Sequence, residues 1–331
     1  MGSPPPVTES ALGRIVVTGG AGFIGANLCQ ALLSAGAEVV ALDDLSSGRT
    51  ENLAGMAGVE LVEGSILDTG LLARVLPGAQ SVVHLAARPS VARSIEDPVS
   101  THETNATGTL RVLQAAAAAG RPHVVVASSS SVYGANRTLP ASEDLPALPL
   151  SPYAASKLAS EAYTLAFASS FGLPVLPFRF FNVFGPLQRA DHAYAAVVPA
   201  FVSAAIAGAA LPVHGDGKQT RDFTYVGSVV AVLVDAVRRG VTAPGPVNLA
   251  FGGRSSVLEL VEVLSTVVGS PLTVHHEDPR PGDVRDSQAD QSKLRALFPS
   301  VEPVALEAGL AATVAWFRSE LGTSSEPVTA H

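Results

Sequence analysis

The sequence is poor in cysteine and in lysine. Cys29 is the single cysteine among 331 residues, so the chain can form no internal disulfide and has no cysteine cluster for zinc. We expect Cys29 to be a small buried thiol in an apolar helix. Lysine occurs only at 157, 218 and 293, no stretch is rich in Lys or Arg, and the formal net charge is -8. This balance excludes nucleic acid as an expected partner.

We expect neither a signal peptide nor a membrane-spanning run in this sequence. Residues 1–13, MGSPPPVTESALG, have no basic start and no apolar core, unlike a signal peptide. The uncharged stretch 193–213 is interrupted by Pro199 and rich in alanine, so it is interpreted as a buried helix beginning near Pro199. We therefore expect no membrane partner and a cytoplasmic location. The adjacent His275 and His276 would point to opposite faces of a strand, and no metal site is expected.

What the chain does have is a regular alternation of short β-branched runs and helical segments. Continuous hydrophobic strands that alternate with helices predict a doubly wound α/β fold, in which helices cover both faces of a parallel sheet. The expected strands are 14–19, 38–43, 59–64, 81–86, 123–128 and 174–179, and the expected helices are 23–36, 69–76, 97–120 and 151–172.

From about residue 186 the pattern is less regular and richer in Pro and Gly. We expect a smaller α/β substrate-binding domain there, capping the carboxyl edge of the sheet, where open α/β folds bind ligands. The predicted domains are 12–185 with a return segment at about 222–252 for the dinucleotide, 186–221 with 253–322 for the substrate, and flexible tails at 1–11 and 323–331.

The stretch GGAGFIG at 19–25 follows the first expected strand and opens the first expected helix. Gly19, Gly22 and Gly25 would permit a tight turn, close approach to a pyrophosphate and close helix–strand packing. The second strand ends in Asp43, which can accept hydrogen bonds from a ribose 2′-hydroxyl and would repel a 2′-phosphate. The pattern favours NAD over NADP. Asp44 could fill this role instead, or both could be turn residues.

Two further features suit catalysis. ASSSSVYG at 127–134 directly follows the fifth strand, where a solvated loop or a site would lie, and SPYAASK follows at 151–157. Tyr153 and Lys157 are four residues apart, so on a helix they share one face, either as a catalytic pair or as ordinary helix residues. The glycine-rich turn, the serine strand end and Tyr-x-x-x-Lys occur in one order, and this agreement favours the catalytic interpretation.

From about 13 to 320 the chain resembles the extended short-chain dehydrogenase/reductase family, and within it the nucleotide-sugar 4-epimerases. The motifs that carry this resemblance are TGGAGFIG, DDLSSG, HLAARPSVARS, NATGTLRVL, SSSSVYG, YAASK, RFFNVFGP, GDGKQTRDF and PRPGDV. The resemblance implies an isomerase with tightly bound NAD, which oxidises carbon 4 of the sugar and reduces it again from the other face.

The resemblance also implies the roles of the catalytic residues. Tyr153 is the base, and because a free phenol has a pKa near 10, the Lys157 ammonium and the positive nicotinamide are needed to lower it. Ser129 hydrogen-bonds the reacting oxygen, and Asn105 supports the active-site helix, unless it is an ordinary helix residue. The implied cofactor-binding residues are Gly19, Gly22, Phe23, Ile24, Gly25, Asp43, Asp44, Ser47, Gly48, Ser65, Ile66, Leu85, Ala86, Ala87, Asn105, Tyr153, Lys157 and Phe180.

A UDP-sugar is the implied substrate, although the sequence does not exclude dTDP. Paired arginines suit the two phosphates of such a ligand. The implied substrate-binding residues are Val91, Ser129, Ser130, Ser131, Tyr153, Asn182, Arg189, Val197, Val213, Arg221, Arg280 and Asp283.

The sugar is assigned by small motif differences. The hydroxyls at 129–131 and GPLQRADHA at 185–193 favour UDP-glucuronate, which would be converted to UDP-galacturonate. UDP-glucose ranks second and UDP-N-acetylglucosamine third. The N-acetyl sugar is sterically possible because Ser287 leaves room where glucose-type relatives carry a bulky Tyr.

Other activities fit less well. Ser130 and Ser131 stand where related 4,6-dehydratases carry an Asp-Glu pair, and Ser131 stands where uronate decarboxylases carry Glu. A non-enzymatic NAD-binding protein would not need Tyr153 and Lys157. By resemblance, helices at about 97–119 and 151–170 form the contact of a homodimer, although alanine-rich helices also pack within monomers.

Overall fold

The computed structural model describes residues 12–190, 195–278 and 285–323. A central sheet of seven parallel strands runs in the order β11-β6-β5-β4-β1-β2-β3. The predicted doubly wound fold is confirmed, and the last strand, β11, was not anticipated. The strands are β1 (Arg14–Thr18), β2 (Glu38–Asp43), β3 (Val59–Glu63), β4 (Ser81–His84), β5 (His123–Ser129), β6 (Val175–Phe180) and β11 (Val247–Leu249).

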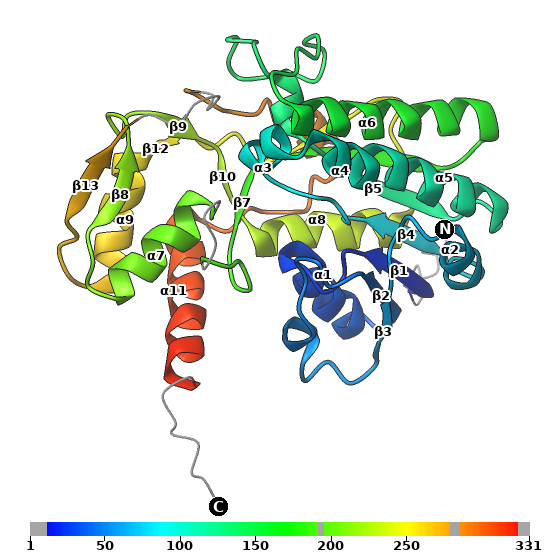
Figure 1. Cartoon of the computed structure of the whole chain (residues 1–331), viewed down its shortest axis with the longest axis horizontal. Coiled ribbons are helices and arrows are strands. Elements are labelled where there is room, and N and C mark those ends of the chain that lie inside the picture. Colours follow the sequence, from blue (N-terminus) through cyan, green and yellow to red (C-terminus); the bar gives the residue numbers. More distant parts are fainter. Residues whose placement is uncertain (1–11, 191–194, 279–284, 324–331) are drawn as a thin grey trace, which may run out of the picture.

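Helices cover both faces of this sheet because successive strand residues point to opposite sides. Ile15 and Val17 of β1 pack in the core beneath one helical layer, whereas Val16 packs in the core beneath the other. In Figure 1 these layers lie below and above the sheet. The first comprises α1 (Phe23–Ser34), α8 (Val226–Arg239) and α10 (Ser292–Leu297), and the second comprises α2 (Thr69–Val75), α5 (Gly108–Ala118) and α6 (Pro152–Phe171).

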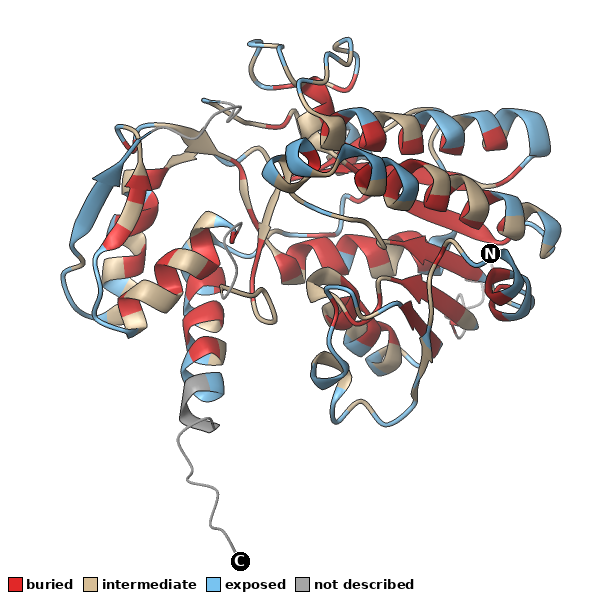
Figure 2. Cartoon of the chain, in the orientation of Figure 1, coloured by how far each residue is buried: buried red, intermediate tan, exposed pale blue. Residues whose placement is uncertain are grey.

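A second core lies beside the sheet. It is built around buried residues such as Phe201, Val213 and Leu260, and Figure 2 shows this buried face on the left of the molecule. Its elements, with the short strands that connect it to the sheet, are β7 (Asn182–Phe184), α7 (Val197–Ile206), β8 (Leu211–His214), β9 (Thr220–Arg221), β10 (Phe223–Tyr225), β12 (Ser255–Ser256), α9 (Val257–Val268), β13 (Val274–Glu277) and α11 (Leu306–Thr323).

The expected helix over 97–120 is divided into shorter pieces. After α3 (Val91–Glu96), Asp97 accepts a hydrogen bond from the Ser100 amide and starts α4 (Pro98–His102). A π-helical turn, η2 (Glu103–Thr107), then leads into α5. This wider turn carries Asn105, so the interruption lies at a predicted site residue. Two 3-10 turns complete the sheet domain, η1 (Thr50–Leu53) and η3 (Ser130–Tyr133).

The expected start of the helix near Pro199 needs a small adjustment. Helix α7 begins at Val197, which places Pro199 within its first turn rather than at its start. No described helix is both long and apolar enough to cross a membrane. Cys29 is fully buried, as expected, and burial raises its pKa to about 12. The predicted tails lie outside the described residues, apart from Thr323 at the end of α11.

The homodimer stays a prediction. Val99 on α4 and Tyr163 on α6 are exposed side chains on the helices that the resemblance places in the dimer contact.

Candidate active site

The glycine-rich turn between β1 and α1 is tightly packed at two of its glycines, Gly19 and Gly25. Gly19 adopts a φ of +71, which L residues rarely adopt, and a Cβ at Gly25 would overlap the carbonyl oxygen of Gly19. Helix α1 therefore starts directly against the strand end, and residues 22–25 at its start line the adjoining cavity. This is the geometry that binds a pyrophosphate at a helix N-terminus.

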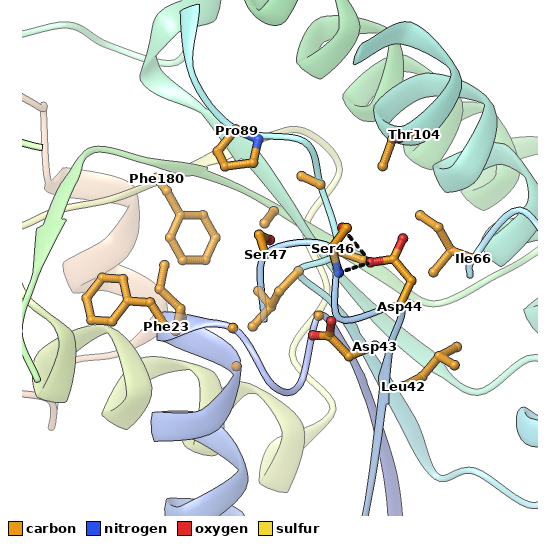
Figure 3. A pocket seen from close by; sticks show the side chains of 18 of the residues that line it. Phe23, Leu42, Asp43, Asp44, Ser46, Ser47, Ile66, Pro89, Thr104 and Phe180 are labelled. Atoms are coloured by element: carbon orange, nitrogen blue, oxygen red, sulfur yellow. Dashed lines mark hydrogen bonds between the residues drawn. The ribbon is translucent and has the colours of Figure 1, made fainter. Parts of the chain in front are cut away.

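Asp43 lies at the end of β2, beside that turn. Its carboxylate accepts hydrogen bonds from the main-chain amides of Ala21 at 3.0 Å and Leu45 at 2.9 Å. Burial raises the pKa of Asp43, and these two bonds partly oppose the shift. Asp44 is turned toward Ser46 and accepts hydrogen bonds from its amide at 3.0 Å and from its hydroxyl at 2.5 Å (Figure 3). Both carboxylates line the cavity, and both suit ribose hydroxyls and disfavour a 2′-phosphate.

The first cavity, of about 270 Å³, runs along the carboxyl ends of the central strands. Of the predicted cofactor residues, Gly19, Gly22, Phe23, Ile24, Gly25, Asp43, Asp44, Ser47, Ile66, Leu85, Ala86, Ala87, Tyr153, Lys157 and Phe180 line it. Figure 3 shows Phe23 and Phe180 at one end and Asp44 and Ile66 at the other. Sequence reasoning missed Leu42, Ser46, Gly64, Pro89, Thr104, Ala127 and Ser128, most of which are immediate neighbours of predicted residues.

Three predicted cofactor residues lie behind this lining. The backbone of Gly48 packs against the Asp43 carboxylate, and the Ser65 hydroxyl accepts a hydrogen bond from the Leu67 amide in its own turn. Asn105 is buried and holds two segments together. It accepts from the Arg88 amide at 2.7 Å and donates to the Ser156 hydroxyl at 2.9 Å.

Tyr153, Lys157 and Ser129 are brought together. Ser151 caps α6 by accepting a hydrogen bond from the Ala154 amide, so Tyr153 lies in the first turn. Burial raises the pKa of Tyr153, and a hydrogen bond from Ser129 partly opposes this. The Lys157 ammonium donates to the carbonyl of Ala127 at 2.8 Å, and burial lowers its pKa to about 8. The triad combines a hydroxyl donor, a phenol and a cation, as base catalysis by a phenol requires.

Behind the triad, a buried chain of hydrogen bonds connects the glycine turn to α6. His84 on β4 lies between the hydroxyls of Thr18 at 2.7 Å and Thr109 at 2.9 Å. Thr109 donates to the carbonyl of Asn105, so its oxygen accepts from His84 Nε2, and Nδ1 accepts from Thr18. This assignment requires a neutral imidazole, which burial favours by lowering the pKa of His84 to about 3.

This neutral histidine predicts a loss of stability in acid. Between about pH 6.5 and 3 the unfolded chain binds a proton at His84 that the folded chain does not, so stability falls as pH decreases through this window, by about 1.4 kcal/mol per pH unit. We expect His84→Gln to make urea-unfolding free energies depend less steeply on pH between 6.5 and 4.5. His102→Gln, at an exposed position, is the control that should keep the wild-type slope, and an unchanged slope in His84→Gln would contradict the assignment.

A second cavity, of about 460 Å³, meets the first at Tyr153. It lies between the sheet and the second core, and the predicted substrate residues Val91, Asn182, Val197 and Arg221 line it with Tyr153. A third cavity adjoins it through Val91, Asn182 and Arg221, and Ser130, Ser131 and Ser287 also line it. The elements that line both cavities come from sequence positions more than a hundred residues apart.

Not every predicted substrate residue reaches these cavities. The side chain of Val213 is fully buried in the second core, and Pro212 and His214 line the second cavity instead, because strand residues alternate in direction. The Val213 side chain therefore lines none of the three cavities, and its contact with substrate stays a prediction. Arg189 is half-buried and lines none of these three cavities. Arg280 and Asp283 lie outside the described residues, where the prediction is untested.

The fold and this site define a dinucleotide-binding enzyme of the short-chain dehydrogenase/reductase class. Residues 15–250 match the "NAD dependent epimerase/dehydratase family". The chain belongs to this family, and its cofactor is NAD, which the glycine turn, Asp43 and the first cavity fit. Within the described residues, no three His, Cys, Asp or Glu side chains could hold a metal ion.

Three relatives illustrate the range of substrates in the family. The UDP-glucose 4-epimerase of Mycolicibacterium smegmatis is 41% identical, over 93% of this chain and 99% of the relative. The structure of UDP-N-acetylglucosamine 4-epimerase from Methanobrevibacter ruminantium M1, in complex with UDP-N-acetylmuramic acid, matches with a TM-score of 0.88 and 36% identity over 93% and 98% of the two chains. The structure of UDP-glucuronic acid 4-epimerase from Bacillus cereus, in complex with UDP-glucuronic acid and NAD, matches with a TM-score of 0.85 and 30% identity. The match covers 93% of this chain and 99% of that one.

Proposed function

We propose that this chain is an NAD-dependent 4-epimerase of a UDP-hexose. The observation that carries the proposal is the place of Tyr153, which lines both the cofactor cavity and the second cavity. A base in this position contacts a sugar hydroxyl on one side and lies beside the cofactor on the other. Ser129 hydrogen-bonds the phenol, and Lys157 is one helical turn away.

The chain's own residues would move one proton. Tyr153 takes the proton of the sugar's 4-hydroxyl, with Ser129 as the donor that orients the reacting oxygen, and returns it after the sugar has turned. With a pKa of about 8, Lys157 is mainly protonated at neutral pH and favours the phenolate. Bound NAD supplies a reversible acceptor for the hydrogen of carbon 4.

The second cavity suits a sugar that must present both faces. Its described lining is mainly apolar, with side chains such as Phe181, Val183 and Phe201. Such walls offer few directional hydrogen bonds, so they can hold either epimer while the diphosphate stays anchored. Arg221 lies in this lining and is the arginine we propose for the diphosphate.

We propose UDP-glucose and UDP-galactose as the first pair to test. Among the described residues that line the second cavity, Arg221 is the only Arg or Lys, and it already donates to the carbonyls of Thr220 and Arg285. The Ser131 hydroxyl donates to Ser129 at 2.9 Å, which engages it within its own turn. A uronate carboxylate needs dedicated donors when it leaves water, so this arrangement supports a neutral sugar. The activity of the mycolicibacterial relative supports the same choice.

UDP-glucuronate, which the sequence motifs rank first, is the second candidate. Ser130 and Ser131 line the third cavity, where they could accompany a substituent of the sugar ring. Dehydration and decarboxylation occur among the relatives of this chain. Both reactions are disfavoured in this chain. Related 4,6-dehydratases carry an Asp-Glu pair at the positions of Ser130 and Ser131, and uronate decarboxylases carry Glu at the position of Ser131.

The test uses the purified protein with UDP-glucose, UDP-glucuronate or UDP-N-acetylglucosamine, without added NAD, and follows the anomeric protons by NMR. We expect UDP-galactose from UDP-glucose with the highest kcat/KM of the three. A higher value for UDP-glucuronate would keep the reaction and reverse the choice of sugar. A pentose product with release of carbon dioxide, or no turnover of any sugar, would refute the proposed epimerase.

A further inference from the structure

An ion pair lies buried directly behind the active site. Arg179 on β6 donates to both carboxylate oxygens of Glu161 on α6, at 3.0 Å from Nε and 2.7 Å from Nη2. Both side chains are about 95% shielded from solvent. The desolvation of two charges largely cancels their attraction, so such a pair adds little net stability. Its position suggests another role.

Glu161 belongs to the catalytic face of its helix. Tyr153, Lys157 and Glu161 are spaced four residues apart on α6 and therefore stack on one side of it. Lys157 is tied to β5 through the carbonyl of Ala127, and Glu161 is tied to β6 through Arg179. Two successive turns of the helix that carries the proposed base are thus fastened to adjacent strands.

The same guanidinium also contacts the serine turn. The Arg179 carbon Cζ lies 4.7 Å from the centre of the Tyr133 ring, a cation–π distance. Tyr133 is the last residue of η3, which directly follows Ser129. The Tyr133 hydroxyl donates to Asn248 Oδ1 on β11 at 2.6 Å, which fixes the ring from its far end.

We propose that Arg179 is a positioning residue that holds the Ser129 turn and the Tyr153–Lys157 helix in one catalytic geometry. It contacts the helix through Glu161 and the turn through the Tyr133 ring, and we call these two contacts of Arg179 the clamp. This inference rests on the proposed function, since it concerns the residues that the epimerase would use. Small displacements of reacting groups lower rates strongly even when the fold is intact.

The variants must separate positioning from folding. Removing Arg179 alone would leave the Glu161 carboxylate unpaired, one helical turn from Lys157, where it could capture the ammonium. The double variant Arg179→Met with Glu161→Leu removes both charges together, and such replacements are often neutral for stability. Arg179→Lys keeps the charge but loses the two-pronged hydrogen bond and the planar contact with the ring.

A matched control exists on α8. Arg239 makes the same kind of two-pronged pair with Asp235, at 2.9 and 2.6 Å, and its Cζ lies 5.2 Å from the Phe298 ring centre. This pair lies at the end of α8 and lines none of the three cavities. Arg239→Lys therefore removes the same types of contact away from the site, from a pair that is partly exposed.

In the double variant and in Arg179→Lys we expect kcat to fall by about 10-fold to 100-fold while KM changes less than about twofold. The acid limb of the kcat–pH profile should move to higher pH, because a displaced Ser129 no longer lowers the pKa of Tyr153. Arg239→Lys should match the wild type in both. If the double variant folds and keeps wild-type kcat and pH profile, the positioning role is refuted. If it does not fold, Arg179→Lys decides the matter by the same criteria.

Amide hydrogen exchange separates this proposal from the proposed function. Whether or not any UDP-sugar is turned over, loss of the clamp should accelerate exchange in 129–133 and 152–157 by about tenfold relative to Arg239→Lys. Faster exchange with an inactive wild type would support the clamp and refute only the epimerase. Unchanged exchange in these segments would refute the clamp.

Discussion

Replacing Tyr153 by Phe is expected to abolish epimerisation. The change removes only the phenolic oxygen, which hydrogen-bonds Ser129 and is the proposed base. General acid–base catalysis contributes about 10²-fold to 10⁴-fold to rates, so kcat should fall by at least about 10²-fold. The measurement is the rate of epimerisation of one UDP-sugar, followed by NMR, on protein that retains its NAD. The NAD content is determined after denaturation.

Tyr163→Phe is the matched control for this experiment. Tyr163 lies on the same helix but is 41% exposed, so its hydroxyl can leave without affecting the site. We expect wild-type activity from this control and unchanged NAD content in both variants. If Tyr153→Phe kept more than about a tenth of the wild-type kcat, Tyr153 would not be the base.

Gly25→Ala is expected to cause the second large effect, the loss of cofactor. The new methyl group would overlap the carbonyl oxygen of Gly19 and approach the Gly20 backbone, so α1 must move away from the strand end. The residues at the helix start that line the first cavity, Gly22, Phe23, Ile24 and Gly25, would move with it. Overpacking of this kind costs about 1–3 kcal/mol. We expect NAD per chain to fall by at least about tenfold and the thermal midpoint to decrease.

Gly245→Ala controls for the effect of an added methyl group. No heavy atom lies within 4 Å of a Cβ built at Gly245, and its φ lies outside the left-handed region. This variant should retain wild-type NAD content and stability, apart from a small effect on the unfolded chain. Full NAD content in Gly25→Ala would show that the turn accommodates a side chain and that the predicted close approach is wrong.

The central fold could be predicted because its signals are local. Each β-branched run formed the expected strand to within about two residues, a normal uncertainty for element ends. The four-residue spacing of Tyr153 and Lys157 predicted that they share one face of a helix, and α6 carries both. Their interpretation as a catalytic pair also needed the glycine-rich turn and the serine strand end. The glycine spacing at 19–25 similarly indicated the turn, since Gly19 adopts a φ that L residues rarely adopt and Gly25 has no room for a Cβ.

The features that the sequence did not reveal depend on contacts between distant segments. The Val213 side chain was assigned to the substrate, but the direction it takes depends on how β8 packs against the second core. The π-turn at Asn105 depends on hydrogen bonds to Arg88 and Ser156, which come from other parts of the chain.

The sequence by itself determined the family, the doubly wound sheet and the identity of the proposed base and its lysine, because spacing and propensity act over a few residues. Only the tertiary structure decided that Tyr153 joins two cavities, that His84 is neutral between Thr18 and Thr109, and that Arg179 pairs with Glu161. Burial and pairing of a polar side chain depend on which distant residues the folded chain brings against it, and no local pattern records that choice.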